Sequence, residues 1–243
     1  SCFLIYEGNS QELYCSLYRR QFLKFLDPYI SLIKALMFYI LQMDHSKILG
    51  TVLAGGKSQR FGDDKSQVKL ANKLLIDYIL SEIIDEFKEL LIISNNPIKF
   101  QKSEKITVIK DFKKDLGPLG GVLTAMKWIK DNNKDYQWIS TFPTDTPFFK
   151  NKILKDFFDK IKPQESKLFF IKSNNLRHNI FGLWSLDLID KLEEDLEKGD
   201  RKVEVWANSV GVNIINMEFS KNDPFFNINT KDDLKKAKNF LND

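Results

Sequence analysis

The sequence predicts an α/β fold built on an open, mostly parallel, Rossmann-like doubly wound sheet. From Ile48 onward, short apolar runs typical of strands alternate with amphipathic stretches typical of helices. This alternation favours parallel strand pairing through helical crossovers. The chain has 243 residues, of which 43% are apolar and 29% charged, and this suffices for a single domain with one substantial core.

The expected elements follow one another in a regular order. Strands are expected at Ile48–Leu53, Leu90–Ile93, Ile106–Ile109 and Trp138–Phe142. Helices are expected at Leu74–Phe87, Leu119–Ile129, Asn151–Ile161, Leu186–Leu196 and Lys231–Leu241. In open sheets of this kind, ligands bind beyond the carboxyl ends of the strands. The residues just after each strand are therefore the candidates for a functional site.

Residues 1–42 differ from the rest because aromatic and apolar side chains crowd them. One interpretation starts the native domain, 43–243, at Met43 and treats residues 1–42 as an upstream extension outside it. The other makes them a helical extension, a hairpin broken at Asp27-Pro28 that docks on the domain, a partner or a membrane surface. The apolar run Ile30–Leu41 is shorter than the roughly 18 to 20 residues that cross a bilayer, so we expect no transmembrane segment.

Composition and charge exclude several classes of protein. The formal net charge is +4, and no basic run is dense enough to predict nucleic-acid binding. The two cysteines, Cys2 and Cys15, form neither a disulfide framework nor a Cys/His metal cluster. We therefore expect a protein of the reducing cytoplasm.

The first expected strand ends in a glycine-rich loop. Gly55 and Gly56 let the backbone approach a ligand, so that its N–H groups can hold phosphate oxygens. Arg60 and Lys65 then supply the positive charge that a triphosphate needs. A P-loop is excluded because that motif needs a glycine where this chain has Thr51.

The string from Leu53 to Lys65 resembles the signature L-A-G-G-x-S-x-R-x-G-x-D-K of the molybdenum cofactor guanylyltransferases and related nucleotidyltransferases. It matches every fixed position. The resemblance implies a nucleotidyltransferase-type sheet in which the backbone of Leu53, Ala54 and Gly55 lies against the nucleotide. It further implies that Gly56 completes the loop and that Lys65 contacts phosphate.

Two further segments resemble this family in the same order along the chain. Asp111 followed by Gly117-Pro118-Leu119-Gly120-Gly121 is similar to the family's guanosine segment, which implies that Asp111 and Gly117 bind the nucleoside. Pro143-Thr144-Asp145-Thr146-Pro147 is similar to its metal motif, which implies that Asp145 binds Mg²⁺ and the nucleotide. The chain departs from the family at Ser94, where asparagine is usual. Ser94 must bind the nucleotide with a shorter reach, or Asn95 or Asn96 must replace it.

The acceptor side of the expected cleft is defined by weaker matches. Asn227 and Asn229 belong to an N-x-N-T run, and Arg201 lies in a G-x-R-x-V segment that the family places near the pterin. His178 stands where the family often has other residues and has a structural interpretation as well. Thr230 and Asp233 are spaced as a capping box for the last helix.

The resemblance implies transfer of GMP from GTP to the phosphate of molybdopterin-bound molybdenum cofactor, with Mg²⁺ as cofactor and Lys65, Arg60 and Asp145 as catalytic residues. Leu-Ala-Gly-Gly favours guanine over the Leu-Ala-Ala-Gly of related cytidylyltransferases. The partners implied are GTP, the molybdenum cofactor, and molybdoenzymes or their chaperones. The alternatives are a cytidylyltransferase of the same cofactor, a sugar- or alcohol-phosphate nucleotidyltransferase, and a catalytically silent carrier of nucleotide or cofactor.

Overall fold

The computed structural model describes residues 26, 28–29, 43–55, 68–219 and 223–240. The chain divides into two compact units, Ser1–Gln42 and Met43–Asp243. The expectations for residues 1–42, and those for Gly56, Arg60 and Lys65, fall almost entirely outside the described residues and stay predictions. No helix in the described part of the chain is long and apolar enough to cross a membrane.

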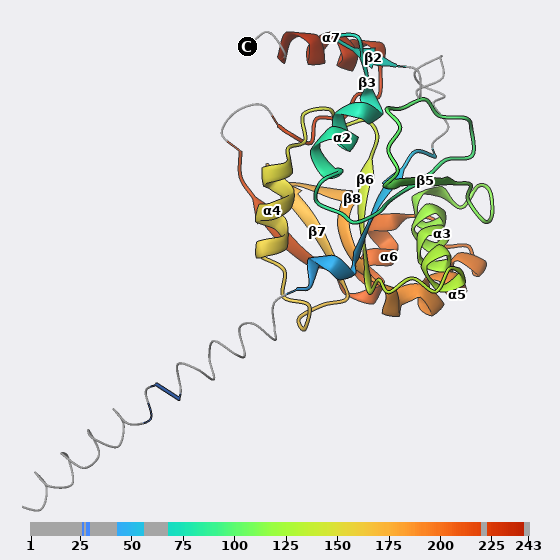
Figure 1. Cartoon of the computed structure of the whole chain (residues 1–243), viewed down its shortest axis with the longest axis vertical. Coiled ribbons are helices and arrows are strands. Elements are labelled where there is room, and N and C mark those ends of the chain that lie inside the picture. The colour runs from blue at the N-terminus through green and yellow to red at the C-terminus, as the bar shows by residue number, and fades with distance from the viewer. Residues whose placement is uncertain (1–25, 27, 30–42, 56–67, 220–222, 241–243) are drawn as a thin grey trace, which may run out of the picture. The chain divides into compact units, whose positions relative to one another are not determined.

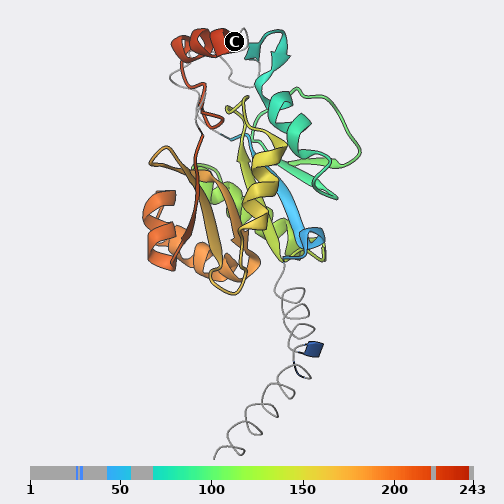
Figure 2. The same ribbon diagram turned by 90° about the vertical axis from the view of Figure 1, so that its left-hand side faces the viewer.

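The second unit is built around a seven-stranded sheet with the order β5-β4-β1-β6-β8-β7-β9 (Figures 1 and 2). Its strands are β1 (Ile48–Leu53), β4 (Leu90–Ile93), β5 (Ile106–Ile109), β6 (Trp138–Pro143), β7 (Leu168–Ser173), β8 (Leu176–Ser185) and β9 (Asn213–Met217). Among these described strands, β8 alone runs antiparallel to its neighbours. The predicted open, mostly parallel α/β sheet is confirmed.

Helices cover both faces of the sheet, as expected for a doubly wound fold (Figure 1). They are α2 (Leu75–Ile83), α3 (Gly117–Asp131), α4 (Asn151–Asp159), α5 (Ile189–Glu197), α6 (Val203–Val210) and α7 (Lys231–Phe240), with short 3-10 turns η1 (His45–Lys47) and η3 (Leu186–Leu188). One core cluster joins α2 and α4 to the sheet, and a second joins α3, α5 and α6 to it. A small hairpin, β2 (Lys69–Leu70) and β3 (Lys73–Leu74), shares a third cluster with α7.

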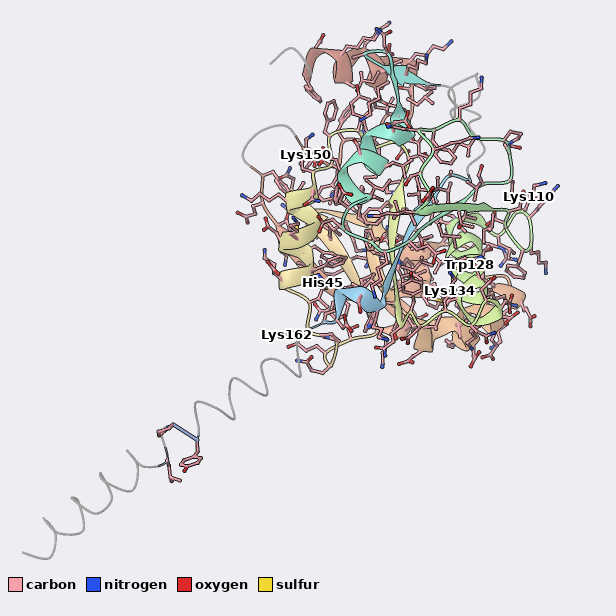
Figure 3. The ribbon with its side chains drawn as sticks, in the orientation of Figure 1. His45, Lys110, Trp128, Lys134, Lys150 and Lys162 are labelled. Atoms are coloured by element: carbon pink, nitrogen blue, oxygen red, sulfur yellow. The ribbon has the colours of Figure 1, made fainter. Side chains whose placement is uncertain are left out.

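His45, Trp128 and Lys134, which are labelled in Figure 3, make side-chain contacts near the amino-terminal ends of the parallel strands. The amine of Lys134 lies 5.1 Å from the centre of the Trp128 ring and 2.9 Å from a carboxylate oxygen of Glu89. His45 packs against Phe158 with ring centres 5.0 Å apart. These contacts are structural, and the candidate site residues gather at the opposite edge.

Several elements were not foreseen from the sequence. The β7–β8 hairpin, β9, α6 and the small β2–β3 hairpin lie where no element was expected. The first helix is shorter than expected: α2 ends at Ile83, whereas an end at Phe87 was expected.

Gly182 of β8 lies beneath Phe170, where an added Cβ would be 2.4 Å from the ring and 2.9 Å from the Phe169 carbonyl oxygen.

Candidate functional site

The carboxyl ends of β1, β4, β5 and β6 lie side by side. Leu53 at the end of β1 pairs with Ile93 and Pro143, and Ile93 in turn pairs with Ile109. The hydrogen bonding between β1 and β4 continues one residue beyond β1, because the Ala54 backbone N–H donates to the Ile93 carbonyl at 2.9 Å. The loops after these four strands therefore meet at one edge of the sheet, as predicted for a ligand site.

Asp111, which follows β5, is held by Asn95, which follows β4. The Asn95 side-chain amide donates to Asp111 Oδ2 at 2.7 Å, and the Asp111 backbone N–H donates to Asn95 Oδ1 at 3.2 Å. Two glycines face the same carboxylate: a Cβ added to Gly55 would lie 3.5 Å from Oδ2, and one added to Gly121 would lie 3.7 Å from Oδ1. The absence of side chains at these glycines leaves room for the carboxylate between the first loop and α3.

The charge of the Asp111 carboxylate is incompletely compensated. Burial raises the pKa of Asp111, and the side chains of Asn95 and Thr124 oppose this shift only in part. Oδ1 is buried, and no hydrogen-bond donor reaches it among the described residues. A buried acceptor of this kind calls for an explanation, and a bound ligand with N–H donors is one.

Ser94 lies in the expected loop but directs its hydroxyl elsewhere. The Ser94 hydroxyl donates to the Asn96 carbonyl at 2.8 Å, and the residue is 5% exposed. Asn95 reaches Asp111, whereas Asn96 is exposed at the surface. Of the three residues that the sequence offered for this position, the structure brings Asn95 to the candidate site.

The turn before α3 brings Gly117 next to the segment of Arg201. Gly117 has a φ of 65°, which favours glycine, and a Cβ added to it would lie 3.8 Å from the Arg201 carbonyl oxygen. The Arg201 guanidinium donates to the carbonyls of Leu196 and Asp200, both at 2.6 Å. A cation bound to the Leu196 carbonyl in the last turn of α5 stabilises the end of that helix. Arg201 thus has a structural role here, and contact with an acceptor stays a prediction.

Asp145 lies in the loop between β6 and α4 and is joined to the segment that precedes α7. Its backbone carbonyl accepts a hydrogen bond from the Ile228 N–H at 2.9 Å. This bond brings the neighbours of Ile228, the exposed Asn227 and Asn229, to the Asp145 loop. The backbone thus brings the Asp145 loop and the segment 227–229 together, and their roles in binding stay predictions.

The capping box predicted for the last helix is confirmed. The Asp233 N–H donates to the Thr230 hydroxyl oxygen at 3.1 Å, and the Thr230 N–H donates to Asp233 Oδ2 at 2.9 Å. The two orphan donors at the start of α7 are thus satisfied reciprocally. The same Asp233 Oδ2 also accepts the Asn229 N–H at 3.1 Å, which holds the backbone of Asn229 beside the start of α7.

His178 is a buried member of an aromatic cluster. Its Nε2 lies 2.7 Å from the Ser173 hydroxyl, and its ring stacks on Phe225 with centres 4.2 Å apart. Burial lowers the pKa of His178, and the nearby charge of Asp223 opposes this shift. These contacts give the ring a packing role, and contact with an acceptor stays a prediction.

The residues at this edge fit a magnesium ion that is held largely by its substrate. Mg²⁺ usually takes one or two protein carboxylates and completes its octahedral shell with phosphate oxygens and waters. Asp145 supplies one carboxylate at the strand end, where a nucleotide would lie. In the described residues no group of three or more His, Cys, Asp or Glu side chains is placed to hold a metal ion.

Comparison with known proteins identifies the family. The family model of the MobA-like NTP transferase domain matches residues 50–210. The chain belongs to this family. The family resemblance and the enzyme class, a nucleotidyltransferase, are thus confirmed, and the match leaves residues 1–42 uncovered.

Individual relatives are similar over most of the chain. A molybdenum cofactor guanylyltransferase of Rhizobium johnstonii is 30% identical over 207 residues, which cover 82% of this chain and 95% of that protein. A molybdenum cofactor guanylyltransferase of Nitrobacter hamburgensis is 27% identical over 192 residues, covering 77% and 91% respectively. The solved structure of molybdopterin-guanine dinucleotide biosynthesis protein A from Archaeoglobus fulgidus has a TM-score of 0.61 at 22% identity, covering 80% of this chain and 98% of that one.

Proposed function

We propose that the protein transfers GMP from GTP to the phosphate of the molybdenum cofactor, with Mg²⁺ as metal, and releases pyrophosphate. The observation that carries this proposal is the meeting of the Asp111 and Asp145 loops with the Gly55 loop at one edge of the sheet. The relatives named as molybdenum cofactor guanylyltransferases support the choice of nucleotide and acceptor. A cytoplasmic location is part of this proposal.

In this proposal the nucleotide lies across the ends of β1, β4 and β5. The backbone of Leu53, Ala54 and Gly55 contacts it, and Gly56 continues the loop around the phosphates. Asp111 and Gly117 receive the guanosine. The incomplete hydrogen bonding of the Asp111 carboxylate supports this role, because guanine offers N–H donors and a buried acceptor needs them.

The reaction is an in-line displacement at the α-phosphorus of GTP. An oxygen of the acceptor's terminal phosphate forms a bond to that phosphorus, and the bond to the bridging oxygen of pyrophosphate breaks. Asp145 holds Mg²⁺, which supplies positive charge against the phosphate oxygens. Lys65 and Arg60 neutralise the charge that develops on the α-phosphate and on the leaving pyrophosphate. Catalysis of this kind rests on positioning and electrostatics.

The acceptor lies on the side of Asp145 where the chain returns before α7. Asn227 and Asn229 are exposed there, and their amides can bind a polar heterocycle or a phosphate. Arg201 and His178 have structural contacts of their own, which weakens the case for them as acceptor ligands. We therefore assign the acceptor first to the two asparagines.

The test measures pyrophosphate release by the purified protein with Mg²⁺ and molybdenum cofactor, with GTP, CTP and ATP supplied separately. We expect release with GTP. Asp145→Ala and Lys65→Ala should each lower turnover by at least ~100-fold, the scale of losing one preorganised charged group. Asp156→Ala and Lys152→Ala, which change exposed residues of α4, serve as matched controls.

Each alternative outcome has a distinct meaning. A preference for CTP would keep the enzyme class and move the protein to the cytidylyltransferases. Release with a sugar or alcohol phosphate in place of molybdenum cofactor would change the acceptor. Absence of release with every nucleotide would favour a silent carrier, and near-normal turnover of both site variants would refute the assigned roles.

A further inference from the structure

We propose that Asn95 is a positioning residue that sets the preference for guanine by holding the Asp111 carboxylate in one orientation. The inference rests on the proposed function, because it concerns the nucleotide site of that reaction. From the resemblance, Asn95 was only one of two possible replacements for Ser94 as a nucleotide ligand, and the role proposed here is a different one, exerted through Asp111.

Two hydrogen bonds join Asn95 and Asp111. One hydrogen bond runs from the Asn95 side-chain amide to Asp111 Oδ2, and the second runs from the Asp111 backbone N–H to the Asn95 side-chain carbonyl. An amide is the side chain that supplies both a donor and an acceptor from one planar group. Each bond fixes a different part of Asp111, so the pair restricts both its backbone and its carboxylate.

This arrangement gives the two carboxylate oxygens different roles. Oδ2 is engaged by Asn95, whereas Oδ1 is buried and receives no donor from the described residues. Gly55 and Gly121 carry no side chain and so leave room for the carboxylate in this position. Asn95 therefore determines which oxygen remains available to a ligand.

Guanine is the base whose edge matches such a carboxylate. Its ring N1–H and its exocyclic amine are adjacent donors, and both can point to a single carboxyl group. Adenine and cytosine present an unprotonated ring nitrogen next to their exocyclic amine, so an ionised carboxylate would face an acceptor. A site with buried polar groups rejects a ligand that leaves them unpaired. If the Asp111 carboxylate loses its fixed orientation, the affinity for GTP should therefore decrease more than the affinity for ATP or CTP.

The neighbouring side chains do not provide the same restraint. The Ser94 hydroxyl donates its hydrogen bond to the Asn96 carbonyl, and Asn96 is exposed. Asn96→Ala is thus a matched control, since it removes the same side chain from the next position in the same loop.

The experiment measures the Kd of GTP, CTP and ATP directly by calorimetry on the full chain, without acceptor. We expect Asn95→Ala to raise the Kd of GTP by about tenfold, the scale of one hydrogen bond to a charged group. The Kd values of CTP and ATP should be nearly unchanged. Asn96→Ala should match the unsubstituted protein. Thermal unfolding of each variant, measured in parallel, shows whether the fold is retained.

A second variant gives a pH signature that loss of packing would not give. Asn95→Asp keeps the acceptor for the Asp111 N–H but places two carboxylates together, and such a pair shares a proton as the pH falls. We expect its GTP defect at pH 8 to exceed that of Asn95→Ala and to shrink at pH 6.

The outcomes separate this inference from the proposed function. If the unsubstituted protein binds GTP no better than CTP or ATP, the proposed function fails and the inference fails with it. If it prefers GTP and Asn95→Ala keeps both the affinity and the preference, the inference alone is overturned. Equal losses for all three nucleotides would also overturn it, because they would indicate general damage to the loop.

Discussion

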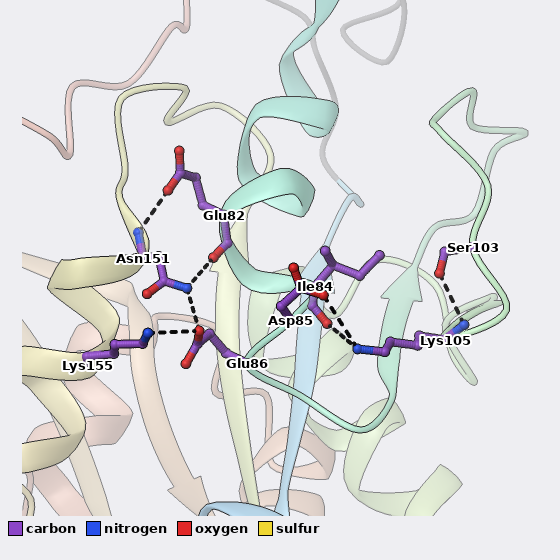
Figure 4. Close-up of polar contacts among 8 residues, drawn as sticks. All are labelled: Glu82, Ile84, Asp85, Glu86, Ser103, Lys105, Asn151 and Lys155. Atoms are coloured by element: carbon purple, nitrogen blue, oxygen red, sulfur yellow. Dashed lines mark hydrogen bonds and ion pairs between the residues drawn. The ribbon is translucent and has the colours of Figure 1, made fainter.

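Glu82 near the end of α2 should stabilise the start of α4 by acting as a cap supplied from another helix (Figure 4). Its carboxylate accepts the Asn151 backbone N–H at 2.9 Å, and the Lys150 amine at 2.9 Å. The Asn151 side chain returns two bonds, to the Glu82 carbonyl at 3.1 Å and to Glu86 at 2.6 Å. No side chain at the N-cap position of α4 performs this function.

The magnitude follows from the separate contacts. Loss of a cap on a first-turn N–H lowers the free energy of unfolding by about 1 kcal/mol. Loss of a hydrogen bond to a charged, partly buried group lowers it by roughly 1.5–3 kcal/mol. The Glu82 side chain is 23% exposed and the Lys150 side chain is 63% exposed, so the ion pair itself adds less than about 1 kcal/mol. Since the cap and the charged bond are the same contact, we expect Glu82→Ala to cost about 2 kcal/mol.

The assay is thermal and urea unfolding of three variants at pH 7. At about 2–4 °C per kcal/mol for a domain of this size, Glu82→Ala should lower Tm by about 4–8 °C. Glu82→Gln keeps an acceptor and should lose about half as much. Lys150→Ala removes the exposed partner and should change the free energy of unfolding by less than about 1 kcal/mol.

The pH dependence of the same variants provides a further check. Burial would raise the pKa of Glu82, but the bonds from Asn151 and Lys150 outweigh burial and lower it. A lowered pKa in the folded state means that the stabilisation is present above the unfolded value and is lost as the pH falls through the folded value. A cost for Lys150→Ala as large as that for Glu82→Ala would refute the capping argument.

Two further changes have consequences that the structure defines. Burial lowers the pKa of His178 in the folded protein, so the unfolded chain binds the proton more readily, and stability should decrease as the pH falls through the pKa of the unfolded state. Urea unfolding at pH 7.5 and 5.5 should therefore show a smaller pH dependence of stability in His178→Gln than in the unsubstituted protein. An unchanged pH dependence would contradict this. Gly182→Ala should cost about 1–3 kcal/mol by overpacking against Phe170, measured as a lower urea midpoint, whereas an unchanged midpoint would show that the ring can move aside.

The sequence predicted the carboxyl edge of the sheet because the evidence for it is local. Two residues after the ends of β1, β5 and β6 the chain has a glycine or an aspartate (Gly55, Asp111 and Asp145), and each strand end was expected within one residue. Parallel pairing then places the ends together whatever the details of the loops. The capping box of Thr230 and Asp233 is local in the same sense, since three residues separate its members.

The remaining features depend on distant parts of the chain. The antiparallel direction of β8 follows from its short connection to β7, where Asn174 and Asn175 both have positive φ. Two asparagines between apolar runs are a signal for such a hairpin and could have revealed it. The choice of Asn95 over Ser94 depends on Asp111, and the burial of His178 depends on Phe225. Neither partner is adjacent in sequence.

The hydrogen bond from Ile228 to the Asp145 carbonyl has a consequence for biosynthesis of the protein. Ile228 and Ala237 also complete the small cluster around Val68 and Leu70, which follows the glycine-rich loop. On the ribosome, the loops after β1 and β6 emerge long before the segment that supports them. A nascent or prematurely terminated chain that ends before Ile228 therefore lacks both this bond to the Asp145 loop and the part of the small cluster that Ile228 and Ala237 supply.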